Sequence, residues 1–350
     1  MRAILVVTVL MCSATLRADD SDVRARPDAF PTLVNPNCSH CVDEMKRRAG
    51  ELRAKDPVLV WTRGYSDGGA IPIRFFLNSY RVISDSYGVF VHDPDAGFAR
   101  GFAASYHFRF HGWRKGVMVM KDGRDGTLYS CLTGLAFAGP KQGTRLGNVP
   151  TLVSQWGEWT EKYPHAVAYH MFAKYKPVEM PREVHADSLK SRLKKIDRRL
   201  PAEEMVFGLW TGKSAVALPI SQMSKALQVI ETLAGPAVVL REPRTGSLGA
   251  YWPKAHQPRK WNAPRPDKDG ISPPDRGVPL PIGAAVTPPV PVNLEVVAGK
   301  VRDRRTRTIF DVAGRGVDGP LAGWTLEPLD AVACKWFAWS AEYPGTTIAE

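Results

Sequence analysis

Alternating hydrophobic and polar residues predict strands in several parts of the chain. The clearest alternation is YHFRFH, whose aromatic and polar residues fall on opposite faces: Tyr106, Phe108 and Phe110 against His107, Arg109 and His111. Further on, MVMKDGRDGTLYSCL has two apolar runs joined by a turn rich in Asp and Gly, which predicts a hairpin of residues 118–120 and 127–132. We therefore expect half-buried antiparallel strands here.

An apolar stripe with helical spacing follows this hairpin. Pro150 and Thr151 mark its start, and Pro164 marks its end. Its members are Leu152, Val153, Trp156, Trp159 and Tyr163. The spacing predicts a helix whose tryptophans pack into the core.

The chain contains an internal repeat. Residues 134–164 and 314–344 align without a gap at nine identical positions. These are Gly134/Gly314, Gly139/Gly319, Pro140/Pro320, Gly143/Gly323, Leu146/Leu326, Trp156/Trp336, Trp159/Trp339, Tyr163/Tyr343 and Pro164/Pro344. A weaker match upstream aligns the region around Pro72 with the region around Pro219. The chain is therefore expected to carry two copies of one unit.

These patterns together predict an α+β fold made of two related domains that arose by internal duplication. Each domain is expected to be a mostly antiparallel sheet with a Trp-bearing helix packed on it. The first repeat domain is predicted to span residues 57–173 and the second residues 204–350, after an N-terminal segment of residues 19–56.

Two further segments stand apart from the repeat. In residues 174–203, Leu189, Leu193, Ile196 and Leu200 recur at helical spacing among Lys and Arg, which predicts a basic amphipathic linker helix. Residues 252–292 are rich in proline and are predicted to form an extended surface insertion in the second domain.

The start of the chain has the pattern of a secretory signal. A basic residue is followed by an apolar run of residues 3–12 and a segment that ends in Ala18. The run is shorter than the ~20 residues that span a bilayer. We therefore expect residues 1–18 to be a cleaved signal peptide, and the mature chain to be periplasmic or extracellular without a transmembrane segment.

The charge balance bears on the partner. Lys and Arg number 47 against 35 Asp and Glu, for a net charge of +12. An exported protein with this modest excess is not expected to bind nucleic acid, and a small ligand or an anionic envelope component is the expected partner.

Several motifs of the first copy together resemble one family. They are VMVMKD, the segment Ser130–Gly134, a G-P-x-x-G turn, and W-x-x-W ahead of Tyr-Pro. This set resembles the domain-of-unknown-function family 3179, whose members are commonly exported bacterial proteins, and the second copy resembles it more weakly. The resemblance implies no established activity. Many members carry a C-P-x-C motif where this chain has His92–Ala96, so no thiol site is implied there.

The segment NPNCSHCVDEM holds two cysteines and a histidine, which are reactive and metal-ligating residue types. Cys38 and Cys41 would share one side at the start of a helix, whose N-terminus lowers the pKa of a thiol, and His40 adds a third ligand. The group is a candidate redox dithiol, a candidate corner of a transition-metal site for zinc or copper, or a structural disulfide with no chemistry.

The second candidate site is the polar face of the predicted strand. His107, Arg109 and His111 would lie there, with Asp93 and Asp95 near it in the first copy. Two imidazoles so spaced can share a metal with carboxylates, or hold an anion with the Arg. The competing interpretation is an outer sheet face in contact with water.

The sequence thus predicts a non-catalytic exported protein that binds a metal ion or small ligand through its first copy. One alternative is an enzyme, either a thiol-disulfide oxidoreductase using Cys38 and Cys41 or a metal-dependent enzyme using His107 and His111. A second alternative is an envelope interaction module that uses the proline-rich insertion.

Overall fold

A computed structural model describes most of the chain. The described residues are 22–34, 52–63, 66–78, 80–85, 88–104, 107–163, 167–168, 182–257 and 288–349. Of these residues, 49% lie in strands and 11% in helices, and the described strands form six sheets. The fold is therefore mostly β, and the predicted α+β class is wrong.

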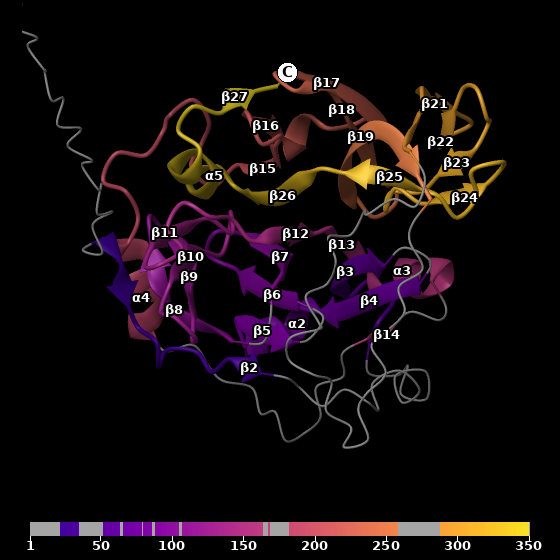
Figure 1. Cartoon of the computed structure of the whole chain (residues 1–350). Coiled ribbons are helices and arrows are strands. Elements are labelled where there is room, and N and C mark those ends of the chain that lie inside the picture. The colour runs from indigo at the N-terminus through magenta and orange to yellow at the C-terminus, as the bar shows by residue number, and fades with distance from the viewer. Residues whose placement is uncertain are drawn as a thin grey trace, which may run out of the picture.

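The first half of the chain forms three sheets, drawn in indigo to magenta in Figure 1. One sheet has the order β13 (Thr151–Gln155), β3 (Pro57–Arg63), β4 (Ser66–Pro72) and β14 (Val167–Ala168). The next has the order β12 (Gly147–Val149), β7 (Phe98–Ala103), β6 (Gly88–Asp93), β5 (Val82–Asp85) and β2 (Leu33–Val34). The third has the order β1 (Arg24–Ala25), β8 (Phe108–Arg114), β9 (Val117–Asp122), β10 (Leu128–Ser130) and β11 (Ala136–Ala138).

The second half forms three sheets with a matching strand order. The first has the order β26 (Asp330–Lys335), β15 (Met205–Trp210), β16 (Ala215–Pro219) and β27 (Thr347–Ile348). The second has the order β17 (Leu227–Thr232), β18 (Gly235–Arg241), β19 (Leu248–His256) and β20 (Val290–Pro291), and β25 (Thr325–Pro328) also pairs with β19. The third runs β21 (Leu294–Val297), β22 (Lys300–Asp303), β23 (Ile309–Phe310) and β24 (Gly316–Asp318). In both halves the four-stranded sheet ends in a parallel strand, β14 beside β4 and β27 beside β16.

The helices are short. They are α2 (Ile73–Asn78), α3 (Trp156–Lys162), α4 (Arg182–Lys190), α5 (Trp336–Glu342) and the 3-10 turn η2 (Ile220–Gln222). The Trp-bearing helix was predicted to start at Pro150, but residues 151–155 form β13 and pair in register with β3. These backbone ladder bonds tie the segment into a sheet, so the helix begins only at Trp156. Trp159 and Trp339 are each 2% exposed, which confirms that they pack into the core.

The two halves share one hydrophobic core. A single cluster contains Phe108 and Met120 of the first half with Val206 and Trp336 of the second. Strand β7 contacts β26 across the halves, and β13 contacts β19 in the corresponding place. In Figure 1 the halves accordingly lie against each other along the strands in the middle of the molecule.

The linker between the halves differs from its predicted form. In the described part of the predicted linker, helix α4 occupies residues 182–190, and the Ser191 hydroxyl donates to the Ser188 carbonyl at 2.6 Å beyond its end. Residues 191–204 then run without a helix, and Ile196 and Leu200 pack against the shared core. The first residues of the predicted insertion belong to β19, which continues to His256, and residues 258–287 of the insertion lie outside the described residues.

Candidate functional site

The predicted histidine face is the outer side of β8. Phe108 and Phe110 are buried, Arg109 is exposed, and His107 and His111 are half-buried. The alternation predicted for these residues is therefore confirmed, and Tyr106 lies outside the described residues. A bulge between Phe110 and Gly112 ends the alternation beyond His111.

Asp93 accepts hydrogen bonds from the backbone of two segments. It ends β6, in a different sheet from β8, and is 0% exposed. One carboxylate oxygen accepts the backbone N–H groups of Asp95 and Ala96 at 3.1 Å each, and the other accepts that of Met118 at 2.9 Å. Burial raises the pKa of Asp93 to about 6. Its carboxylate therefore ties the turn after β6 to strand β9.

The structure does not gather the predicted metal ligands. Among the residues it describes, no group of three or more His, Cys, Asp and Glu side chains could hold a metal ion. Asp95 is half-buried in the turn that Asp93 closes. Cys38, His40 and Cys41 lie outside the described residues. The same part of the chain contains no helix long and apolar enough to cross a membrane.

Two other cysteines lie in the shared core. Cys131 and Cys334 are each 0% exposed and are not joined in a disulfide. Burial raises the pKa of both thiols, well above the usual value for Cys131. Buried thiols with raised pKa values are inert, because the thiolate is the reactive form.

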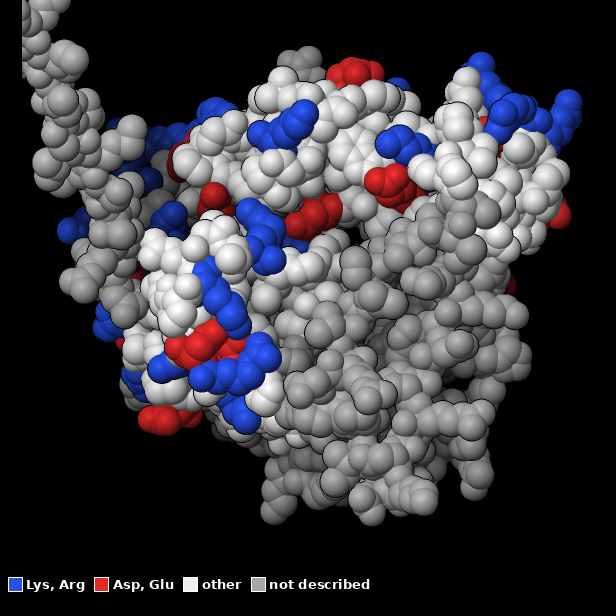
Figure 2. Space-filling view, viewed as in Figure 1, with Lys and Arg blue, Asp and Glu red and all other residues white. Residues whose placement is uncertain are grey.

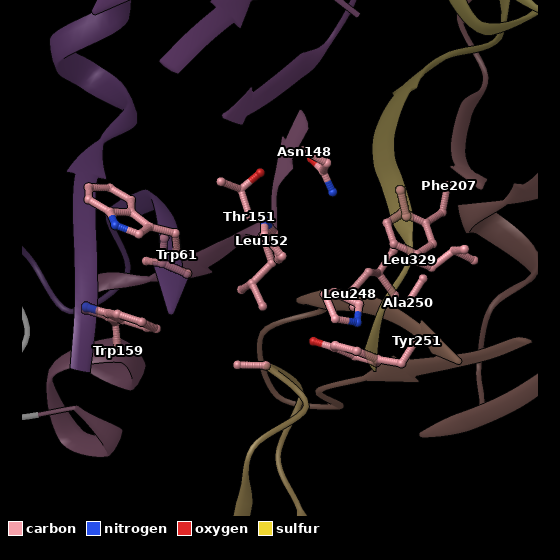
Figure 3. Close-up of a pocket in the computed structure, with 16 residues that line it drawn as sticks. Trp61, Asn148, Thr151, Leu152, Trp159, Phe207, Leu248, Ala250, Tyr251 and Leu329 are labelled. Carbon is pink, nitrogen blue, oxygen red and sulfur yellow. The ribbon is translucent and has the colours of Figure 1, made fainter. Parts of the chain in front are cut away.

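A pocket between the halves is lined by aromatic rings (Figure 3). Trp61 and Trp159 lie on one side with Thr151 and Leu152, and Phe207 and Tyr251 lie on the other with Leu248 and Leu329. Its free space is about 30 Å³. That volume holds about two water molecules. The pocket is therefore a packing seam of the two halves and has no room for a ligand.

A larger groove lies between the linker and α5. Its volume is about 660 Å³, within the ~300–1,000 Å³ typical of ligand sites. It is lined by Lys115, Arg192, Leu193, Lys195, Ile196, Asp197, Arg198, Phe337, Ser340, Ala341 and Pro344. Figure 2 shows Lys and Arg side chains gathered at the left edge of the view, where Figure 1 draws the segment that follows α4.

The charge of this groove is positive. Four of its residues are cationic and one, Asp197, is acidic. The Asp197 carboxylate accepts four hydrogen bonds from Arg199 at 2.8–3.2 Å, and this partner lowers the pKa of Asp197. Lys195 and Arg198 are exposed, and neither forms an ion pair or hydrogen bond within the described part of the chain. The charge of Asp197 is thus neutralised by Arg199, whereas Lys195 and Arg198 remain available to bind an anion.

One wall of the groove is held by the guanidinium of Arg192. It lies 3.9 Å from the centroid of the Phe337 ring and forms a 2.9 Å ion pair with Glu203. Its buried Nε has no hydrogen-bond partner. Gly116, in the hairpin tip between β8 and β9, permits this packing, since a Cβ there would lie 2.7 Å from the Arg192 side chain and 2.9 Å from the Phe337 ring.

The floor of the groove is apolar. Phe337 and Ala341 are 2% and 8% exposed, and Ile196 packs against the shared core. Leu193 is 42% exposed at the groove. The arrangement can hold an organic anion, with its charge at the cationic rim and its carbon skeleton on the floor.

Sequence reasoning identified the basic residues of this segment but not the groove. The helical spacing of Leu189, Leu193 and Ile196 placed the cations on the solvent side of a helix. The groove exists because the segment leaves the helix at Lys190 and turns toward α5. The Lys and Arg density of residues 190–199 was the available signal.

Comparison with known proteins identifies a family but no activity. Residues 108–346, more than half of the chain, match the family described as protein of unknown function DUF3179 in a single stretch. No curated protein and no solved structure matches the chain. The match runs from the start of β8 to the segment after α5, so it includes every residue that lines the groove. This chain therefore belongs to the DUF3179 family of proteins of unknown function.

Proposed function

We propose that this protein is an exported binding protein that holds an organic anion in the groove between the linker and α5. The observation that carries the proposal is the pair Lys195 and Arg198, which lie without partners among the described residues at the rim of a 660 Å³ groove. An anion placed there would gain two charge-assisted contacts. This site replaces a metal site on β8 as the expected binding site.

The ligand would lie where the two halves and the linker meet. Lys115 comes from the first half, Arg198 from the linker and Phe337 from the second half. Lys115 donates to the Ala341 carbonyl at 3.2 Å, which holds the hairpin tip against α5. The ligand would thus contact all three parts of the chain.

We also infer that the two halves are tandem copies of one ancestral unit. The nine identities between residues 134–164 and 314–344 support this inference, as does the common strand order of the three sheets. Export is proposed on the signal-like pattern of residues 1–18.

Isothermal titration calorimetry with three probes tests the binding proposal. The probes are octyl phosphate below its micelle concentration, inorganic phosphate, and octyl glucoside as an uncharged molecule with the same chain. We expect octyl phosphate to bind one per chain and more tightly than either of the others, because only it matches both rim and floor.

Two double variants with equal net charge distinguish the groove from the general basic surface. Lys195→Glu/Arg198→Glu is expected to weaken octyl phosphate binding at least tenfold, since each contact to a charged group contributes about 1.5–3 kcal/mol. Lys213→Glu/Lys225→Glu changes two exposed cations away from the groove and should bind normally. Equal affinity in both double variants, or no binding by the unaltered protein, would refute the proposal.

A further inference from the structure

Two sheet edges of the first half are paired with strands of the N-terminal segment, whereas no described strand covers the equivalent edges of the second half. The edge of β5 pairs with β2, and the edge of β8 pairs with β1. Strands β17 and β21 hold the corresponding end positions in the second half, and no described strand pairs with their outer sides. Unpaired edges of this kind are templates for an added strand.

The correspondence holds residue by residue. The hairpin of β5 and β6 pairs Val82 with Val91 and ends at Asp85 and Gly88, whereas the hairpin of β17 and β18 pairs Val229 with Val238 and ends at Thr232 and Gly235. Val82 lies three residues before the end of β5, and Val229 lies three residues before the end of β17, so the two valines occupy the same position in their hairpins. In the other sheet, Val296 of β21 pairs with Val301 of β22, as Phe110 of β8 pairs with Met120 of β9. Val296 therefore occupies the position of Phe110.

One residue of the N-terminal segment fills the space between β5 and β8. The ring centroid of Phe30 lies 5.0 Å from that of Phe110 and 6.1 Å from that of Trp113. Phe30 is 6% exposed and belongs to the same core cluster as Val82. Residues 24–34 therefore act as a cover that pairs with both edges and inserts one aromatic ring between them.

Among the described residues, no segment covers the second half in this way. Val82 and Phe110 are 0% and 2% exposed, but Val229 and Val296 are 55% and 46% exposed. Leu233, at the turn after β17, is 82% exposed. Strand β17 contacts β21 as β5 contacts β8, so Val229 and Val296 lie on neighbouring strands whose outer edges no described strand pairs with. This region is here called the β17–β21 notch.

We propose that the β17–β21 notch is a docking site for an extended segment of a partner polypeptide that carries a bulky apolar side chain, as residues 24–34 do in the first half. The open edge supplies backbone donors and acceptors for an added strand, and Val229 and Val296 supply the apolar contact for the inserted side chain. This site is distinct from the anion groove and does not depend on it.

A synthetic peptide is the direct probe. The peptide SDVRARPDAFPTLV, residues 21–34, is labelled with a fluorophore and titrated with the full chain by fluorescence anisotropy. We expect one peptide bound per chain, and at least tenfold weaker binding of the peptide with Phe30→Ala.

Variants of the full chain locate the binding. Val229→Asp should weaken peptide binding at least tenfold, and it should leave the fold intact because the side chain is already 55% exposed. Val317→Asp is the matched control, at 54% exposure on β24, and should bind normally.

Three outcomes would overturn the proposal. One is the absence of binding, and another is binding that Val229→Asp does not change, because the peptide would then be replacing the cover of the first half. The third is self-association of the chain that Val229→Asp abolishes, because the occupant would then be a second copy.

Discussion

The ionisation of Asp93 is expected to lower the stability of the protein between about pH 4 and pH 6. Asp93 is fully buried, and burial raises its pKa from 3.8 to about 6. In this range the folded state keeps a proton that the unfolded state has released. Stability therefore falls as the pH rises through this range, and the full loss is present above pH 6.

The size of the effect follows from the shift. A change of one pKa unit corresponds to about 1.4 kcal/mol, so a shift of about two units lowers the free energy of unfolding by about 3 kcal/mol. His92 acts in the opposite direction, because burial lowers its pKa to about 3 and its neutral form is favoured in the fold. The wild-type curve alone therefore does not isolate Asp93.

The assay compares the wild-type protein with Asp93→Asn. Urea unfolding, followed by tryptophan fluorescence, is measured from pH 4 to pH 7. Asparagine carries no charge at any pH. Its single amide oxygen cannot replace both carboxylate oxygens as acceptors of backbone N–H groups, so the variant starts with a fixed loss of stability. We expect the free energy of unfolding of the wild type, minus that of the variant, to fall by about 2–3 kcal/mol from pH 4 to pH 7.

Asp125→Asn is the control for this comparison. The ion pair of Asp125 with Lys141 at 2.8 Å lowers the pKa of that half-buried carboxyl. The stability that ionised Asp125 contributes is complete above pH 4 and is lost in more acidic solution. The difference curve for Asp125→Asn should therefore be flat between pH 5 and pH 7. A flat difference curve for Asp93→Asn as well would refute the argument that burial raises the pKa of Asp93 by more than its three hydrogen bonds lower it.

Two substitutions test the packing of the core and the junction of the halves. Gly208→Ala places a Cβ 2.4 Å from the Trp339 ring, and we expect it to destabilise the protein by about 1–3 kcal/mol, measured as a lower urea midpoint; an unchanged midpoint would contradict the packing described for α5. Arg100→Met removes the buried partner of Asp330, whose carboxylate lies 2.7 Å from the guanidinium in the other half. We expect the free energy of unfolding to fall by about 3 kcal/mol in the same assay, because a partly buried charge is left unpaired. A loss below about 1 kcal/mol would contradict this.

Some features of the fold were readable from local sequence. The alternation around Phe108 and the turn signal between residues 120 and 127 correspond to β8 and to the hairpin of β9 and β10. Such patterns can be read because a strand face and a tight turn depend on residues that are close in sequence. The Trp-bearing helix was harder to predict, because the pairing of residues 151–155 with β3 depends on a segment far away in the chain.

The candidate site was less predictable than the strands. The polar face of β8 has the predicted orientation, but Asp93 is in another sheet and serves the backbone. The groove was not foreseen, since it needs the linker to leave its helix at Lys190 and α5 to pack beside it.

The sequence by itself determined the repeating pattern of the two halves, the resemblance to the DUF3179 family and the excess of basic residues. Only the tertiary structure decided which cations converge on a groove and which sheet edges are covered. The same hairpin buries Val82 in one half and exposes Val229 in the other, because residues 24–34 lie on the first alone. That difference depends on contacts between segments distant in the chain, which no local pattern of residues contains.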